Sequence, residues 1–417
     1  MNKIKTNTFK NNLQTIYIPI PSAKSATVLI LVKAGTRYEQ KRTNGISHFL
    51  EHMVFKGTKN FPSARDLAVA VDNIGGEFNA FTSKEYTGFY VKSAVEHLDL
   101  SLKIISELVF SPLLPKEELE RERGVILEEI KMYEDDPGVN IYDYFEEVCF
   151  PHSSLGWDTK GLPKNIHNLQ RKDFTDYLDY MYSPNRMVLA IAGGIKTDKR
   201  MHDLVLKYFG QNQKQVIFTE NSFTFQQTEP KIKIIEKDTQ QTHLIYGFRT
   251  EGRLSKDRYI LLLLATILGS GMSSRFFTEI REKRGLAYAV GTTRNNYKES
   301  GYLALKADTS HHTAQQVLEL ANVEFEKIKK KKIGEKELKK AKEFIKGHML
   351  LGFEDSMEVA DFYATDLLLD NKIRDIDAVL RKIDQVSSSD ILRVANKFFI
   401  EKNKNMAAIG KNKNLGI

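Results

Sequence analysis

The sequence predicts an α+β fold built from two tandem, homologous α/β-sandwich domains, and three observations favour it. Apolar strand-like runs alternate with amphipathic helical segments along the whole chain. A pattern of residues at 166–193 recurs at 383–410, at a constant offset of 217. The length of 417 residues leaves room for two domains of about two hundred residues each.

The first half combines buried strands, helices and one hairpin. Residues 26–34 are almost wholly apolar, which predicts a buried strand. Ser63 and Asp66 have the spacing of a capping box, which predicts the start of a helix. The other expected elements are a hairpin of residues 77–82 and 86–92, helices at 95–110, 116–133, 139–148 and 171–181, and a strand at 187–193.

The second half repeats this plan. Residues 242–248 resemble the first strand, 285–306 resemble the hairpin, and 318–346 resemble the two helices that follow it. Polar segments at 211–214 and 226–230 join the halves. We therefore expect two homologous domains, an N-terminal domain at 1–225 and a C-terminal domain at 226–417.

Composition excludes several classes of protein. The single cysteine, Cys149, rules out an internal disulfide framework and a thiolate-rich zinc site. The longest apolar run, 259–268, is too short to cross a bilayer and predicts a buried helix, so no membrane span is expected. The N-terminus has no secretory signal, so a cytoplasmic location is expected.

The chain carries a net charge of +8, but the distribution of that charge does not favour nucleic acid. The most basic run, Lys327 to Lys332, is interleaved and followed by glutamates. Such mixing is typical of a solvated helix face, and no set of stacking aromatics accompanies it. We expect no nucleic-acid partner.

The segment His48-Phe49-Leu50-Glu51-His52 carries the strongest chemical signal. On a helix, residues four apart share a face, so His48 and His52 direct both imidazoles to one point. Glu51 lies beside that point and could take a proton from water activated by the metal. The pattern is the inverse H-x-x-E-H zincin motif. The pentapeptide alone also fits two ordinary core or surface histidines.

A third ligand is expected in the acidic helix at 116–133. Glu122 and Glu129 are seven residues apart and share a face, whereas Glu128 is rotated away by about 100°. The repeat places Ala341 and His348 at the matching positions of the second half, which also lacks H-x-x-E-H. Because both patterns are restricted to the first half, we expect one metal site in the N-terminal domain and no metal ligands in the C-terminal domain. An ordinary charged helix exposed to water is the alternative for the acidic residues.

Four segments together resemble a known family, the pitrilysin-like zinc peptidases, and within it the branch of the mitochondrial processing peptidase β subunit and its bacterial relatives. They are A-G-T-R-Y-E (34–39), N-G-I-S-H-F-L-E-H-M-V-F-K-G-T (44–58), N-I-G-G-E-F-N-A-F-T-S (73–83) and E-R-E-R-G-V-I-L-E-E-I (120–130). The resemblance spans nearly the whole chain. It implies that His48, His52 and Glu129 bind Zn²⁺, that Glu51 is the general base, and that Glu122 supports a zinc ligand.

The resemblance also implies substrate contacts. The family's edge strand is matched by Asn79, Ala80, Phe81 and Thr82, whose backbone would pair with an extended peptide. An Arg-x6-Tyr pattern is matched by Arg281 and Tyr288, which would orient the substrate carbonyl. From the residues alone, Asn79 equally fits a strand end, Arg281 a helix surface and Tyr288 strand packing.

The expected function is a zinc metalloendopeptidase that hydrolyses short or unfolded peptides in a closed chamber. The family resemblance implies that one chain supplies half of a clamshell, completed in a homodimer or in a heterodimer with an inactive homologue. The competing function is a non-catalytic structural or assembly subunit of the same fold. Co²⁺ or Mn²⁺ could also occupy a site of two imidazoles and one carboxylate.

Overall fold

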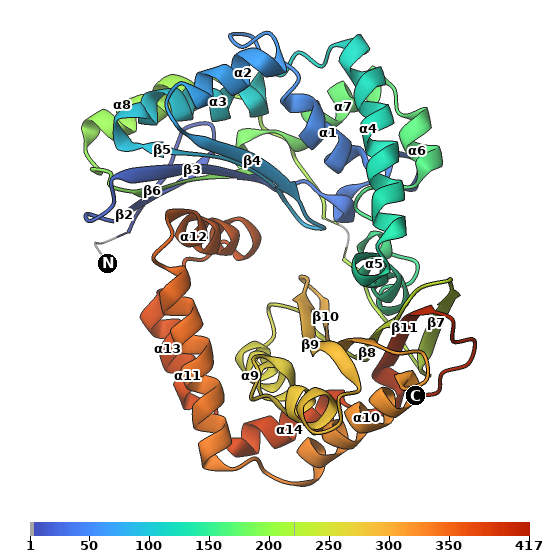
Figure 1. The fold of residues 1–417 in the computed structure, drawn as a ribbon. Helices are drawn as coiled ribbons and strands as arrows, with labels where there is room; N and C mark the ends of the chain where they lie inside the picture. Colours follow the sequence, from blue (N-terminus) through green and yellow to red (C-terminus); the bar gives the residue numbers. More distant parts are fainter. Residues whose placement is uncertain (1–3, 221) are drawn as a thin grey trace. The chain divides into compact units, whose positions relative to one another are not determined.

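The computed structural model describes residues 4–220 and 222–417, which form two compact units, each built on its own sheet (Figure 1). The first unit contains residues 4–130, 157–220 and 351–374. The second contains residues 131–156, 222–350 and 375–417. Both units mix helices with a β-sheet, which confirms the predicted α+β class.

The sheet of the first unit has six strands in the order β1-β2-β6-β3-β5-β4. Strands β2 and β6 are parallel, and the other neighbours are antiparallel. The strands are β1 (Lys5–Thr8), β2 (Gln14–Pro19), β3 (Ser25–Val32), β4 (Glu77–Thr82), β5 (Thr87–Ala94) and β6 (Met187–Gly193). Strand β4 lies at the edge, since β5 is its only strand neighbour among the described residues.

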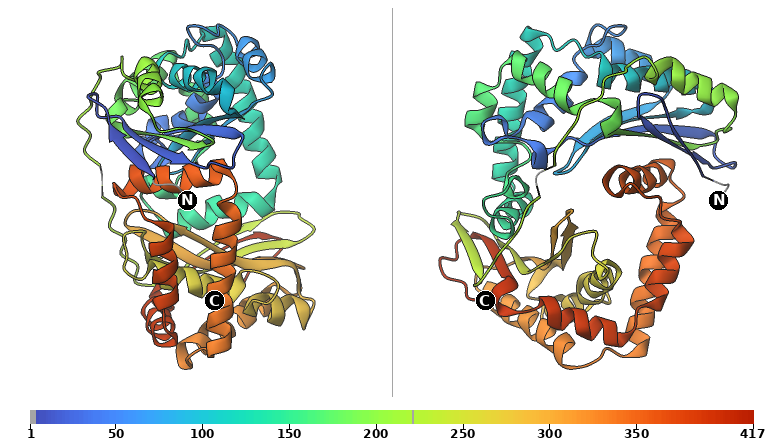
Figure 2. Two further views of the ribbon diagram at one scale, coloured as in Figure 1. Left: turned by 90° about the vertical axis from the view of Figure 1, so that its left-hand side faces the viewer. Right: turned by 180° about the vertical axis from the view of Figure 1, so that it is seen from behind.

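Helices cover both faces of this sheet, which explains why β3 and β6 are continuously apolar. On one face Val28, Ile30 and Val32 pack with residues of α1. On the other, Leu29 and Leu31 pack with α12. Figure 2 shows this helix, coloured orange-red, lying against that face of the sheet. The helices of this unit are α1 (Ile46–Val54), α2 (Ala64–Asp72), α3 (Leu98–Phe110), most of α4 (Lys116–Asp135), α6 (Pro163–Asn168), α7 (Arg171–Met181), α8 (Lys199–Phe209) and α12 (Ser356–Asp370).

The sheet of the second unit has five strands in the order β7-β11-β8-β10-β9. Helix α5 covers one face, where Ile141 and Phe145 pack with Tyr302, and α9, α10 and α14 contact the same sheet. The strands are β7 (Lys231–Glu236), β8 (Thr242–Glu251), β9 (Ala287–Asn296), β10 (Ser300–Thr309) and β11 (Lys404–Gly410). The helices are α5 (Pro137–Cys149), α9 (Arg258–Gly269), α10 (Ala314–Lys330), α11 (Glu335–Gly352), α13 (Ile376–Gln385) and α14 (Ser388–Phe398).

Each sheet receives a helix from the other half of the chain. Helix α12 belongs to the C-terminal half but packs on the first sheet, where Ser356 Oγ lies 2.8 Å from Thr27 Oγ1. Helix α5 belongs to the N-terminal half but packs on the second sheet. The compact units therefore interleave along the chain. The division into homologous domains at 1–225 and 226–417 describes the repeat in the sequence, and it stays a prediction.

Most local predictions are confirmed, and the small differences have simple causes. Helix α7 and strand β6 have the predicted bounds, and Ser63 and Asp66 form the predicted capping box. Strand β5 begins one residue late because Tyr86 belongs to the turn, where its carbonyl accepts from Ser83 N at 2.9 Å. Within the described residues, no helix is long and apolar enough to cross a membrane.

Candidate metal centre

Helix α1 carries both histidines of the motif. Its apolar residues, including Phe49 and Met53, are buried against the sheet, so His48 and His52 project from a different face. The helix begins at Gly45, whose φ of 98° is left-handed, and a Cβ there would lie 2.7 Å from Lys160 O. Only glycine fits this close approach without strain.

A buried carboxylate outside the helix holds the start of α1. Glu39 accepts hydrogen bonds from the backbone N–H groups of Gly45 and Ser47, both at 2.9 Å. It also accepts from Ser47 Oγ at 2.6 Å and from Asn44 Nδ2 at 2.9 Å. Glu39 therefore accepts the hydrogen bonds that an N-cap side chain would accept, because the N-cap residue of this helix is a glycine.

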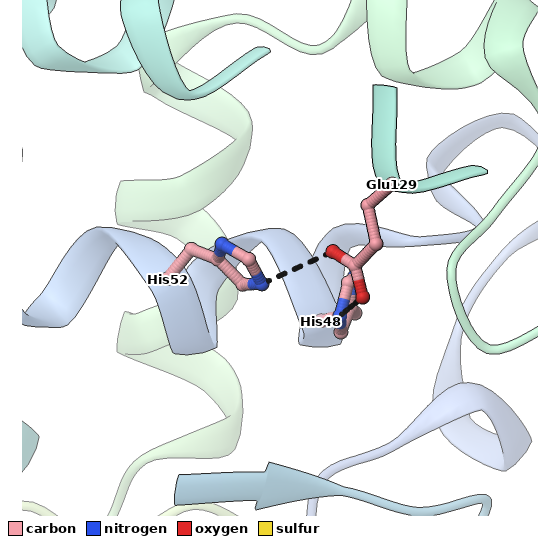
Figure 3. A group of neighbouring side chains, drawn as sticks. All are labelled: His48, His52 and Glu129. Atoms are coloured by element: carbon pink, nitrogen blue, oxygen red, sulfur yellow. Dashed lines mark ion pairs between the residues drawn. The ribbon is translucent and has the colours of Figure 1, made fainter. Parts of the chain in front are cut away.

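Glu129 of helix α4 reaches the two histidines (Figure 3). His48 Nε2 lies 3.6 Å from Glu129 Oε1, and His52 Nε2 lies 3.5 Å from Glu129 Oε2. One donor atom from each of the three residues lies within 4.8 Å of the other two. Two imidazole nitrogens and one carboxylate oxygen suit zinc, and three protein ligands leave a further coordination position open.

The protonation of His48 suits this role, and that of His52 is set by opposing effects. Burial and the neighbouring His52 lower the pKa of His48 to about 3, so its imidazole is neutral and its lone pair can bind a cation. Burial alone would lower the pKa of His52. Its hydrogen bond with Glu122 and the carboxylates of Glu129 and Glu51 outweigh burial and raise that pKa.

Glu122 contacts a candidate ligand and not the metal position. Its Oε1 accepts from His52 Nδ1 at 2.9 Å, so Nδ1 carries the proton and Nε2 faces Glu129. Its side chain is only 7% exposed. Burial raises the pKa of Glu122, but the bonds from His52 and Lys56 outweigh it and leave that pKa lowered.

Glu51 lies on α1, one residue before His52, and its carboxyl group interacts electrostatically with His52 and Glu129. Its Oε2 accepts a hydrogen bond from Thr82 Oγ1, the last residue of β4. Burial raises the pKa of Glu51, although the bond from Thr82 opposes this shift. A carboxylate with a raised pKa is a better proton acceptor when it is ionised.

The residues predicted to bind substrate lie in two places. Asn79, Ala80, Phe81 and Thr82 form the second part of edge strand β4, as expected. In the second unit, Arg281 and Tyr288 lie together, with the guanidinium 5.3 Å from the tyrosine ring centre. Tyr288 is 77% exposed, so its hydroxyl is not used for core packing. Their contact with substrate stays a prediction.

Two contacts near the centre were not predicted from the sequence. Lys56 pairs with Glu122, and it lies four positions after His52, a spacing that could have suggested a shared face. The hydrogen bond from Thr82 to Glu51 has no sequence signal, because it joins a strand and a helix whose packing no local spacing specifies. The sequence predicts for Thr82 only a backbone contact with substrate.

Comparison with known proteins identifies the family of this chain and relatives that are named zinc proteases. Residues 14–156 match the insulinase domain of peptidase family M16, and residues 168–345 match the peptidase M16 inactive domain. The uncharacterized zinc protease YmxG of Bacillus subtilis is 33% identical, over 95% of this chain and 96% of that protein. An uncharacterized zinc protease of Rickettsia felis is 32% identical, over 94% of this chain and 93% of that protein.

Solved structures show the same fold. A protease from Helicobacter pylori superposes with a TM-score of 0.93 at 26% identity, over 98% of this chain and 99% of that one. A peptidase M16 inactive domain from Pseudomonas fluorescens superposes with a TM-score of 0.90 at 17% identity, which is evidence for the fold alone.

Proposed function

This chain belongs to peptidase family M16, and we propose that it is a zinc-dependent endopeptidase acting on short or unfolded peptides. The observation that carries the proposal is the convergence of His48, His52 and Glu129 to within 4.8 Å. Relatives along the whole chain are named zinc proteases, which supports a peptidase of the same kind.

In the proposed mechanism His48, His52 and Glu129 hold the zinc ion. Bound there, zinc would supply a Lewis acid that polarises the scissile carbonyl and acidifies water. Glu122 keeps the proton on His52 Nδ1, so that Nε2 is available as a ligand. His48 is already neutral at physiological pH because burial and His52 lower its pKa to about 3.

Glu51 is the proposed general base. Its Oε2 is held by Thr82, which leaves Oε1 to take the proton from the attacking water. The same carboxyl group then delivers that proton to the leaving amine. Burial raises the pKa of Glu51, which makes its carboxylate a stronger base for the first of these steps.

Edge strand β4 is the proposed docking site for the peptide. The outer backbone edge of Asn79 to Thr82 has no strand partner among the described residues, so an extended peptide can pair with it. Main-chain pairing gives affinity with loose sequence preference. Arg281 and Tyr288 are proposed to contact the substrate carbonyl, Tyr288 as a hydrogen-bond donor to the developing oxyanion.

The assembly belongs to the proposal as well. A homodimer that encloses the substrate in a chamber is our preferred arrangement, and a heterodimer with an inactive homologue is the alternative. We also propose a cytoplasmic location and a relationship to the branch of the mitochondrial processing peptidase β subunit. Light scattering on the pure protein tests the homodimer, which should have twice the chain mass of 47.8 kDa.

Hydrolysis of a quenched-fluorescence peptide library tests the function. The pure protein should contain about one zinc per chain, cleave unstructured peptides, lose activity in a chelator and regain it with Zn²⁺. Sequencing the products would define the cleavage preference. Stoichiometric zinc with no cleavage of any peptide would contradict the enzyme and favour the non-catalytic assembly subunit. Absence of zinc binding would contradict the metal centre itself.

A further inference from the structure

We propose that Lys56 is a positioning residue of the metal centre, acting on His52 through Glu122. This inference rests on the proposed function, because it assigns Lys56 a part in holding the zinc site. Lys56 touches none of the three candidate ligands in the contacts described above. Its only described partner at the centre is the carboxylate of Glu122.

The carboxylate of Glu122 is shared between two donors. Its Oε1 lies 2.9 Å from His52 Nδ1, and its Oε2 lies 2.6 Å from Lys56 Nζ. Both contacts have the lengths of charge-assisted hydrogen bonds. Because each oxygen has its own donor, the carboxylate cannot rotate without losing one of them. Lys56 therefore fixes the orientation in which Oε1 faces the His52 ring.

The position of Lys56 is set by its backbone. Its N–H donates to Met53 O at 3.1 Å, which ends helix α1 in a turn. The next residue, Gly57, has a φ of 136°, and a Cβ there would lie 2.5 Å from Pro62 O. Leu113 N donates to Gly57 O at 2.9 Å and ties this turn to the segment after α3. These contacts hold the backbone of Lys56 in place.

Charge balance gives Lys56 a second effect on the same site. Glu122, Glu129 and Glu51 place three carboxylates around His52. Glu122 is only 7% exposed, so water does little to stabilise its charge. The ammonium of Lys56, whose side chain is 24% exposed, supplies a compensating positive charge at Oε2 of this carboxylate. Without it, Glu122 would be a buried carboxylate with the histidine as its remaining partner.

The test compares Lys56→Met, which keeps the length of the side chain, with Lys56→Arg, which keeps the charge and donors. Lys59→Met is the matched control, since Lys59 is exposed in the same loop. Zinc affinity is measured on the full chain by competition with a chromophoric chelator. Removing supporting groups of metal ligands typically weakens binding by about 10- to 100-fold. We expect about tenfold for Lys56→Met, recovery of most affinity in Lys56→Arg and no change in Lys59→Met.

Further readouts separate positioning from general stability. The visible absorption spectrum of the Co²⁺-loaded protein reports ligand geometry, and it should change in Lys56→Met and not in Lys59→Met. The effects of Lys56→Met and Glu122→Gln should be non-additive, because both act through one carboxylate. Should Lys56→Met not fold, Lys56→Gln removes the charge with a smaller change in polarity.

Two results would overturn the inference. One is a Lys56→Met protein with the zinc affinity and cobalt spectrum of the unaltered chain, even if it melts at a lower temperature. The other is full additivity with Glu122→Gln. An unaltered chain that binds no zinc would instead overturn the proposed function, so the two failures are distinguishable.

Discussion

Thr82 donates a hydrogen bond to Glu51, and this bond joins the last residue of edge strand β4 to the metal-motif helix α1. The strand proposed to bind the peptide therefore also holds the proposed general base. Because Thr82 occupies one oxygen of Glu51, the other oxygen is the one left for chemistry. A peptide paired along β4 would place its backbone next to this carboxylate.

Glu51→Gln should abolish turnover and keep the metal. The amide has nearly the same shape but cannot accept a proton from water, and loss of a general base typically costs about 10²- to 10⁴-fold in rate. Zinc content and peptide hydrolysis are measured on the same sample. Thr82→Val is a milder companion that should slow turnover less. Peptide cleavage by Glu51→Gln at the normal rate would refute Glu51 as the base.

Glu129→Gln and Glu128→Gln form a matched pair on one helix. Both remove one negative charge from α4, but only Glu129 lies within reach of His48 and His52. We expect Glu129→Gln to weaken zinc binding strongly and to lose activity, because a neutral amide is a poor zinc ligand. Glu128→Gln should bind zinc normally. Equal zinc affinity in the two variants would remove Glu129 from the ligand set.

Glu39→Gln should destabilise the protein by about 1–3 kcal/mol, the cost of leaving buried donors without an acceptor. The amide would turn its NH₂ group toward the donors of Gly45 or Ser47, which now point at carboxylate oxygens. Urea unfolding measures the change. Glu96→Gln, at a side chain that is 80% exposed, is the control and should leave the stability unchanged. An unaffected Glu39→Gln protein would show that α1 starts without this carboxylate.

Asp361→Asn should stabilise the protein at neutral pH and have no effect in acid. Burial, with a smaller contribution from Glu358, raises the pKa of Asp361 from 3.8 to about 6. The folded state therefore binds this proton more tightly than the unfolded state, so stability falls as the pH rises from about 4 to about 6. Allowing for partial exposure, we expect a gain of about 1–2 kcal/mol above pH 7.

Thermal unfolding of both proteins across this range measures the difference. The difference should shrink as the pH falls below about 6 and vanish below about 4. A gain of the same size at every pH would mean that the substitution acts through packing and not through the charge of Asp361.

Tyr288→Phe should lower kcat with little change in KM if the hydroxyl donates to the oxyanion. Loss of one such donor typically costs about 10²- to 10³-fold in kcat. Tyr180→Phe, which removes a hydroxyl from another exposed tyrosine, is the control and should have no effect. A normal kcat for Tyr288→Phe would leave Tyr288 without a part in the chemistry.

The sequence by itself determined the local elements and the candidate ligands of this protein. The period of apolar residues predicted helices such as α1, α4 and α7, because one face of each must be buried. The same period set His48 beside His52 and put Glu122 and Glu129 on one face of α4. The absence of both patterns from the second half then linked them to a single site.

Only the tertiary structure decided which elements pack together and which polar side chains bind each other. Helix α12 covers the first sheet and α5 the second, and no local pattern specifies which sheet an amphipathic helix will cover. The bonds of Lys56 to Glu122 and of Thr82 to Glu51 join residues far apart in the chain. Hydrophobic periodicity tells which face of an element is buried, but the partner of a polar side chain depends on how the elements pack.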